Sequence, residues 1–253
     1  MSDRRFWRIL GLIVLVAAAM RVGHIAAIHE TPMWHFAEGW VTSDMHTNLN
    51  WADHLASGDW LDRETFRPKF PWQAGIASEE VWSRWLGPGV FYQPPLYAYL
   101  LALTIRATGS PDFFRVLQVL LGAANAGLVG LLGWKTAGRA AGLIAAGLAA
   151  LYAPWILYDG ELLRGTLALT TALLSLLALL EARRRSAAGG DAGPIWRRYR
   201  TWGAAGAALG IAYLTESAIV TFIPLALLWA LFARVEAPEP ERSSRKKAAR
   251  KTG

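Results

Sequence analysis

The chain alternates long apolar stretches with short polar breaks, apart from one extended polar region near its N-terminal end. Several of these stretches approach the roughly 20 apolar residues that a helix needs to cross a bilayer. The candidate spans are Phe6–Ala27, Phe113–Trp134, Ala140–Tyr158, Leu162–Glu181, Trp202–Thr215 and Ala218–Phe232. The last two are short, and only the tripeptide Thr215-Glu216-Ser217 separates them. The pattern predicts an all-α integral membrane protein with about six transmembrane helices.

The first apolar stretch begins with basic residues, as signal peptides do. It is longer than the usual apolar core of a signal peptide, however, and the sequence RVGHIAAIHE offers no convincing small-residue cleavage site. We therefore expect a retained first transmembrane helix.

A further apolar segment, Pro94–Ala107, has too few apolar residues to cross a bilayer. The second of its two prolines suits the first turn of a helix. We expect a helix that lies at the membrane interface, with Tyr92, Tyr97 and Tyr99 at the level of the lipid headgroups.

The positions of the basic residues predict the topology. With six spans and a cytoplasmic N-terminus, most of the 26 lysines and arginines fall on the cytoplasmic side, as the positive-inside rule requires. Residues 1–233 then form the transmembrane module, and residues 29–112 form a large first extracytoplasmic loop. Residues 234–253 form a basic cytoplasmic tail that we expect to be disordered. We predict a multi-pass protein of the cell inner (plasma) membrane with both termini in the cytoplasm.

Composition narrows the class further. The chain is 54% hydrophobic with a mean hydropathy of +0.26, values that are unusual for a soluble domain. It contains no cysteine, which excludes disulfides and thiolate metal sites. The net charge of +7 follows the membrane pattern rather than one soluble face, so we expect no nucleic-acid partner. The tryptophans of the first loop form an interfacial belt and a small core, or include one or two rings that stack on a sugar.

The stretch SDMHTNLNWADHLASGDW carries candidate chemistry. Its small and apolar residues recur at helical spacing: Met45, Leu49, Ala52 and Ala56. Ser43 is a candidate N-cap and Gly58 a candidate C-terminal cap. A helix of about three turns results, and Asp44 lies in its first turn.

Two interpretations of Asp44 fit the sequence. A carboxylate near a membrane surface can act as a general base or bind a divalent cation, but aspartate is also common in first turns because the helix dipole stabilises its charge. His46 and Asn50 share a helical face and could line a polar groove. No spacing matches a known metal-binding motif, so the need for a metal stays open, and a divalent cation is the one cofactor considered.

The order of several segments resembles that of a known family. An aspartate in the first outer loop is followed by WADHLASGDWL, YQPPLYAYLLAL and a long segment that ends in YDGELLRGTLAL. This order is similar to that of the GT-C membrane glycosyltransferases that use polyprenyl-phosphate sugars. They include the dolichyl-phosphate-mannose protein mannosyltransferases and the bacterial aminoarabinose transferase. The likeness covers about Ser43 to Leu180.

The resemblance implies a role for each matching residue. Asp44 corresponds to the family's acidic residue that acts on the acceptor in an inverting displacement. Many relatives carry a second acid directly after it, where this chain has Met45. Arg164 stands where relatives often carry an acid at the start of a helix, and it suits a lipid phosphate or snorkels to the interface. The residues expected to contact substrate are His46, Tyr92, Gln93, Asp159, Glu161 and Arg164.

The predicted function is transfer of a sugar from a polyprenyl-phosphate donor to an unknown protein, lipid or glycan acceptor at the extracytoplasmic face. Family members usually continue with more helices and often a soluble domain. We therefore expect a fragment, a split enzyme completed by a second subunit, or a degenerate copy. One alternative is a catalytically incomplete module that binds lipid-linked sugar or acts as a scaffold. A transporter is a second alternative, although no pair of broken helices in matching halves supports it.

Three charged or titratable residues lie within or near the predicted spans: Arg21, His24 and Glu216. Such residues often serve function, but ion pairing inside the helix bundle explains them equally well.

Overall fold

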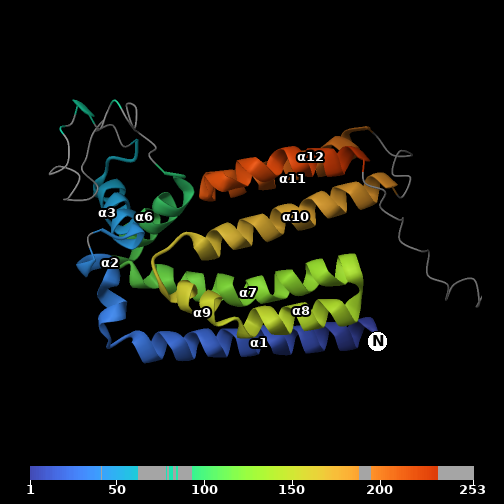
Figure 1. Ribbon diagram of the computed structural model, residues 1–253, viewed down its shortest axis with the longest axis horizontal. Coiled ribbons are helices and arrows are strands. Elements are labelled where there is room, and N and C mark those ends of the chain that lie inside the picture. Colours follow the sequence, from blue (N-terminus) through green and yellow to red (C-terminus); the bar gives the residue numbers. More distant parts are fainter. Residues whose placement is uncertain are drawn as a thin grey trace, which may run out of the picture.

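The computed structural model of the chain describes residues 1–40, 42–61, 78, 80–81, 84, 93–187 and 195–232. Every regular element in these ranges is a helix (Figure 1). The helices that run along the bundle are α1 (Asp3–Ile28), α7 (Asp112–Ala137), α8 (Arg139–Leu151), α9 (Ala153–Gly160), α10 (Gly165–Ala187), α11 (Ile195–Thr215) and α12 (Phe222–Phe232). The elements gathered at one end are η1 (Pro32–His35), α2 (Phe36–Gly39), α3 (Asp44–Ser57) and α6 (Leu96–Thr108). We call this end, together with residues 161–164, the cap end.

Among the described residues, three helices, α1, α7 and α10, are long and apolar enough to cross a bilayer, and the pair α8 and α9 is a fourth span if its two parts count as one. The prediction of an all-α membrane protein is thereby supported. The predicted fifth and sixth spans are not confirmed. α11 does not meet the criteria for a span, and the segment Ser217–Trp229 is a shorter apolar helix. The number of six spans stays a prediction.

The candidate span Ala140–Tyr158 is divided into two helices, because the chain bends by 53° between α8 and α9. Pro154 lies in the first turn of α9. Proline has no backbone N–H to donate, and its ring clashes with the preceding helical turn. α8 therefore ends at Leu151, and α9 begins after the extended residue Tyr152.

The bundle exposes many large apolar side chains. Leu15 of α1 and Leu148 of α8 are 68% and 70% exposed, and α7 and α12 expose further leucines. A monomeric soluble protein rarely leaves so much apolar surface in contact with water. The exposure is expected if lipid surrounds these helices, and it supports a membrane-embedded protein.

Basic residues gather at the end of the bundle opposite the cap end, which we call the basic end. It comprises the start of α1, the turn between α7 and α8, and the end of α10 (Figure 1). Two ion pairs join helices there: Asp3 with Arg139, and Lys135 with Glu181. This distribution follows the predicted topology. Which side of the membrane this end faces stays a prediction.

The cap end has its own apolar core. α3 and α6 pack together, and their buried residues join Phe114 of α7 and Leu162 in one cluster. The expected helix after the double proline is present as α6, and its length falls below that of a span. The predicted position of Tyr97 is wrong, because Tyr97 is 1% exposed inside this cluster rather than at the level of the lipid headgroups. The hydroxyl of Tyr99 donates to the carbonyl of Trp60.

Some predictions fall outside the described residues: Tyr92, the tail 234–253, and the tryptophans at 72, 82 and 85. Four first-loop tryptophans are described: Trp34 and Trp51 are buried, Trp60 is half-buried, and Trp40 is 56% exposed. Trp40 is thus the best placed of these four rings to meet a ligand.

Candidate functional site at the cap end

Helix α3 forms where the sequence predicts it. The Oγ atom of Ser43 accepts a hydrogen bond from the backbone N–H of His46 at 3.2 Å, which satisfies one free donor at the N-terminus of the helix. Gly58 ends the helix with φ 130°, a backbone conformation that residues with a side chain rarely adopt. Asp44 therefore lies in the first turn, where its side chain is exposed.

Asn48 binds α3 to the turn between α9 and α10. Its Nδ2 atom donates to the carbonyl oxygen of Leu162 at 3.1 Å, and the residue is 3% exposed. Asp44 precedes Asn48 by about one helical turn, so both side chains project from the same side of α3. The exposed carboxylate of Asp44 is thereby directed to the side of α3 that faces residues 161–164. Asn48 was not predicted as a site residue, although its spacing of four residues from Asp44 indicates that the two share a helical face.

Arg164 joins three segments at the cap end. Its Nη1 atom donates to Oε1 of Gln93 at 3.0 Å, just before α6. Its Nε atom donates to Oε2 of Glu216 at 2.8 Å, just after α11. The Arg164 side chain is 26% exposed, so part of the guanidinium stays open to a ligand. Two of the predicted substrate-binding residues, Gln93 and Arg164, are therefore in direct contact.

His46 occupies a different face of α3. Its Nδ1 atom lies 2.8 Å from the carbonyl oxygen of Ala37 in α2, and its Nε2 atom lies 2.7 Å from Nδ2 of Asn50. The two contacts place one ring nitrogen beside a carbonyl acceptor and the other beside a side-chain amide. The predicted shared face of His46 and Asn50 is confirmed. Both ring nitrogens are occupied by neighbours in α2 and α3, and neither bonds to Gln93 or Arg164.

Asp159 lies inside the bundle, 3% exposed, and forms an ion pair with Arg21 of α1 at 2.6 Å. Its second carboxylate oxygen accepts from the hydroxyl of Thr166 at 2.5 Å. Arg21 is 1% exposed and also donates to the carbonyl oxygens of Ala17 and Ala150. The carboxylate of Asp159 is thus used in joining α1, α9 and α10, which favours the ion-pairing explanation of Arg21.

Gly122 of α7 is the position against which this ion pair packs. A Cβ atom added there would lie 2.0 Å from Oδ2 of Asp159 and 2.7 Å from Nε of Arg21. We expect Gly122→Ala to displace the pair and lower the free energy of unfolding by about 1–3 kcal/mol. Gly147→Ala in α8 is the matched control, because no atom lies within 4 Å of the added Cβ. Thermal unfolding in detergent measures both, and equal melting temperatures would contradict the packing described.

Glu161 is buried without a hydrogen-bond partner for its carboxylate. It is 5% exposed, and neither carboxylate oxygen has a partner among the described residues. Its backbone carbonyl and that of Asp159 both accept from Nε2 of Gln118, whose Oε1 accepts from the hydroxyl of Tyr97. Burial raises the pKa of Glu161, and the nearby Arg115 guanidinium opposes part of this effect. The turn is therefore held through its backbone while its carboxyl group stays unpaired.

The raised pKa of Glu161 sets the sign of a pH effect. The folded state binds a proton more tightly than the unfolded chain, whose glutamate has a pKa near 4.5, so this group destabilises the folded protein as pH rises through its folded pKa. We expect Glu161→Gln to raise the melting temperature at about pH 7 and to have a smaller effect near pH 5. Melting curves of both proteins across this range test the effect. An equal difference at every pH would contradict it.

No group of three or more histidine, aspartate or glutamate side chains in the described ranges is close enough to hold a metal ion. Asp44, Asp159 and Glu161 thus do not form a preformed metal site. No protein-family model matches the chain, and neither a curated protein nor a solved structure is significantly similar to it. The resemblance described above therefore rests on the order of its sequence segments alone.

Proposed function

We propose that this chain is a membrane glycosyltransferase of the GT-C type, which transfers a sugar from a polyprenyl-phosphate donor to an acceptor at the extracytoplasmic face. The cap end is then the extracytoplasmic end, and the basic end lies in the cytoplasm. The observation that carries the proposal is the convergence of α3 and Arg164 at the cap end: Asn48 binds the carbonyl of Leu162, and Arg164 follows two residues later beside Gln93.

In this proposal Asp44 is the general base. Its exposed carboxylate accepts the proton of the acceptor hydroxyl or amine as that atom attacks the anomeric carbon of the sugar. The bond from the anomeric carbon to the phosphate oxygen breaks, and the lipid phosphate departs with the electron pair. Because this is a single displacement, the configuration at the anomeric carbon is inverted. A product with retained configuration would contradict it.

Arg164 is the group that binds the lipid phosphate. Its side chain is 26% exposed at the cap end, and Gln93 and Glu216 fix the direction of the guanidinium. A planar guanidinium binds phosphate oxygens in pairs and stabilises the charge that develops on the leaving group. Gln93 and Glu216 thus act as positioning residues for Arg164.

Equilibrium binding of a labelled polyprenyl-phosphate sugar to the purified full chain tests this assignment. We expect Arg164→Gln to weaken binding by roughly tenfold, since it removes a charge-assisted contact. Arg106→Gln is the matched control, because Arg106 also lies at the cap end but donates to the carbonyl of Ala56. Equal binding by wild type and Arg164→Gln would contradict the role of Arg164.

The alternative proposal is a module that binds the lipid-linked sugar without turning it over and serves a second subunit. The absence of a second acid directly after Asp44, where Met45 stands, favours it. The two proposals differ in turnover, because both predict donor binding and only the first predicts sugar release by this chain.

A further inference from the structure

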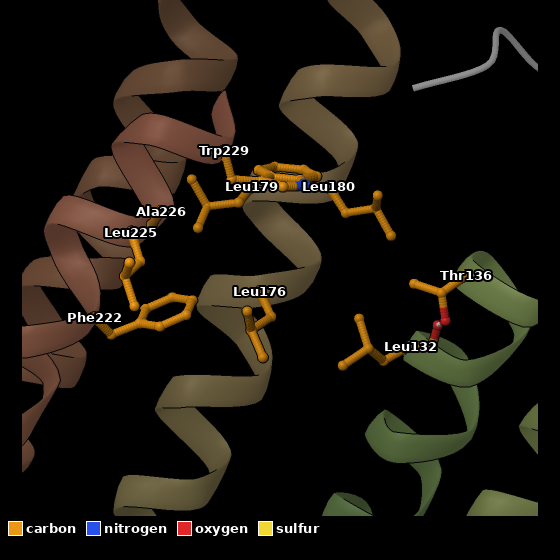
Figure 2. Close-up of a pocket in the computed structure, with 9 residues that line it drawn as sticks. All are labelled: Leu132, Thr136, Leu176, Leu179, Leu180, Phe222, Leu225, Ala226 and Trp229. Carbon is orange, nitrogen blue, oxygen red and sulfur yellow. Dashed lines mark hydrogen bonds between the residues drawn. The ribbon is translucent and has the colours of Figure 1, made fainter. Parts of the chain in front are cut away.

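An apolar cavity opens between α7, α10 and α12, away from the proposed site at the cap end. Its volume is about 490 Å³, within the range of about 300–1,000 Å³ that is typical of ligand-binding pockets. Figure 2 shows Leu176 and Leu180 of α10 between Leu132 of α7 and the side chains of α12. Thr136 is the one polar residue that lines it, and its hydroxyl donates to the carbonyl of Leu132 at 2.8 Å. The walls therefore offer an occupant apolar contact and no free donor from Thr136.

The cavity lies toward the basic end. Lys135 directly precedes Thr136, and Arg184 follows Leu180 by about one helical turn. The Arg184 guanidinium donates to the backbone carbonyl of Lys135. This contact joins the ends of α7 and α10 next to the lining residues Thr136 and Leu180, and we call the three cations there, Lys135, Arg184 and Arg185, the basic mouth of the cavity. Glu181 is the acidic partner there, bonded to Lys135 at 3.5 Å and to Arg185 at 2.7 Å. One carboxylate among these three cations leaves the mouth with a net positive charge.

Three tryptophans near this mouth indicate its depth in the membrane. Trp229 of α12 lines the cavity near its basic end (Figure 2). Trp202 of α11 donates from its ring nitrogen to Oγ of Ser186 at 3.2 Å, and Trp134 directly precedes Lys135. Tryptophan is enriched at the level of lipid headgroups. The apolar cavity thus meets its basic mouth at the depth where acyl chains meet headgroups.

We infer that this cavity binds one anionic glycerophospholipid of the surrounding bilayer, with an acyl chain between α7, α10 and α12 and its phosphate at Lys135 and Arg184. Charge complementarity selects this occupant, because a zwitterionic lipid fills the apolar part equally well but gains less from the basic mouth. The inference does not depend on the proposed glycosyltransferase activity, since the cavity lies at the opposite end of the bundle from Asp44.

Native mass spectrometry of the full chain tests the inference, with phosphatidylglycerol and phosphatidylcholine of the same acyl composition as probes. We expect preferential retention of phosphatidylglycerol, reduced by roughly fivefold in Lys135→Gln and again in Arg184→Gln. Arg5→Gln is the control for charge, because Arg5 lies at the basic end on α1, a helix that does not line the cavity. Equal retention of both lipids, or undiminished phosphatidylglycerol binding by the double variant, would overturn the inference.

The acyl-chain contact is tested separately. Leu176→Phe narrows the cavity and should reduce lipid retention, whereas Leu148→Phe on the exposed face of α8 should not. If Leu176→Phe fails to fold, phosphatidylglycerol with brominated acyl chains should quench the wild type more than Trp229→Phe, and equal quenching would overturn the inference. Displacement of phosphatidylglycerol by polyprenyl phosphate with the same dependence on Lys135 and Arg184 would assign the cavity to the carrier lipid and likewise overturn it.

Discussion

The variant Asp44→Asn is expected to lose sugar transfer while it keeps its fold and its affinity for the donor. An amide cannot accept the acceptor's proton, and general-base catalysis typically contributes about 10²–10⁴-fold to a rate. Asp44 is exposed, and the N-cap of α3 is provided by Ser43, so the substitution leaves no buried group unpaired. We expect kcat to fall by this factor and the KM for the donor to change little, because the lipid phosphate binds Arg164.

Asp53→Asn is the matched control for this loss. Asp53 lies nine residues after Asp44 on the same helix, which corresponds to about two and a half turns and places it on the opposite face. Burial raises the pKa of Asp53, and the carboxylate of Glu38 in α2 adds a smaller contribution. A fall in kcat that is equally large for Asp53→Asn would contradict a specific role of Asp44.

The variant Asp159→Ala is expected to be the most destabilising single substitution considered for this chain. It leaves the guanidinium of Arg21, which is 1% exposed, without its carboxylate. Removing one partner of a buried ion pair costs about 3–5 kcal/mol, because the remaining charge stays buried and uncompensated. Thermal or chemical unfolding in detergent should show this loss.

Two comparisons separate the ion pair from other effects of the substitution. Asp3→Ala removes the partner of Arg139, but both side chains of that pair are exposed, Asp3 by 60% and Arg139 by 39%, and we expect a loss of no more than about 1 kcal/mol. Replacing both partners, as in Arg21→Met with Asp159→Leu, should recover most of the stability, since no buried charge remains. If Asp159→Ala is as stable as Asp3→Ala, the pair of Asp159 and Arg21 does not hold the bundle as described.

The elements that local chemistry determines could be predicted from the sequence. Ser43 and Gly58 mark the two ends of α3, and the double proline marks the start of α6. The apolar runs that became α1, α7 and α10 were recognisable from length and composition alone. In each case a single stretch of sequence contains the whole signal.

Features that depend on distant contacts could not be predicted in this way. The position of Tyr97 inside the core follows from its contact with Gln118, 21 residues further along the chain.

The bend between α8 and α9 has a local cause in Pro154, but the sequence analysis treated Ala140–Tyr158 as a single candidate span. An apolar run does not by itself reveal that it is divided, because both parts remain hydrophobic.

The residues of the candidate site also differ in whether their positions could be predicted from the sequence. Asp44 could be identified by its place in a helical first turn. The contacts of Arg164 with Gln93 and Glu216 span 71 and 52 residues, and no pattern along the sequence specifies them. The buried pairing of Asp159 with Arg21 likewise separates a structural carboxylate from the exposed one at Asp44.

We propose that this chain by itself releases sugar from a polyprenyl-phosphate donor at the cap end. The most direct measurement is sugar release from a radiolabelled polyprenyl-phosphate sugar by the purified full chain, with Asp44→Asn and Asp53→Asn assayed in parallel. We expect turnover by wild type and Asp53→Asn and loss of turnover in Asp44→Asn. Donor binding without turnover in all three proteins, or equal turnover in all three, would contradict it.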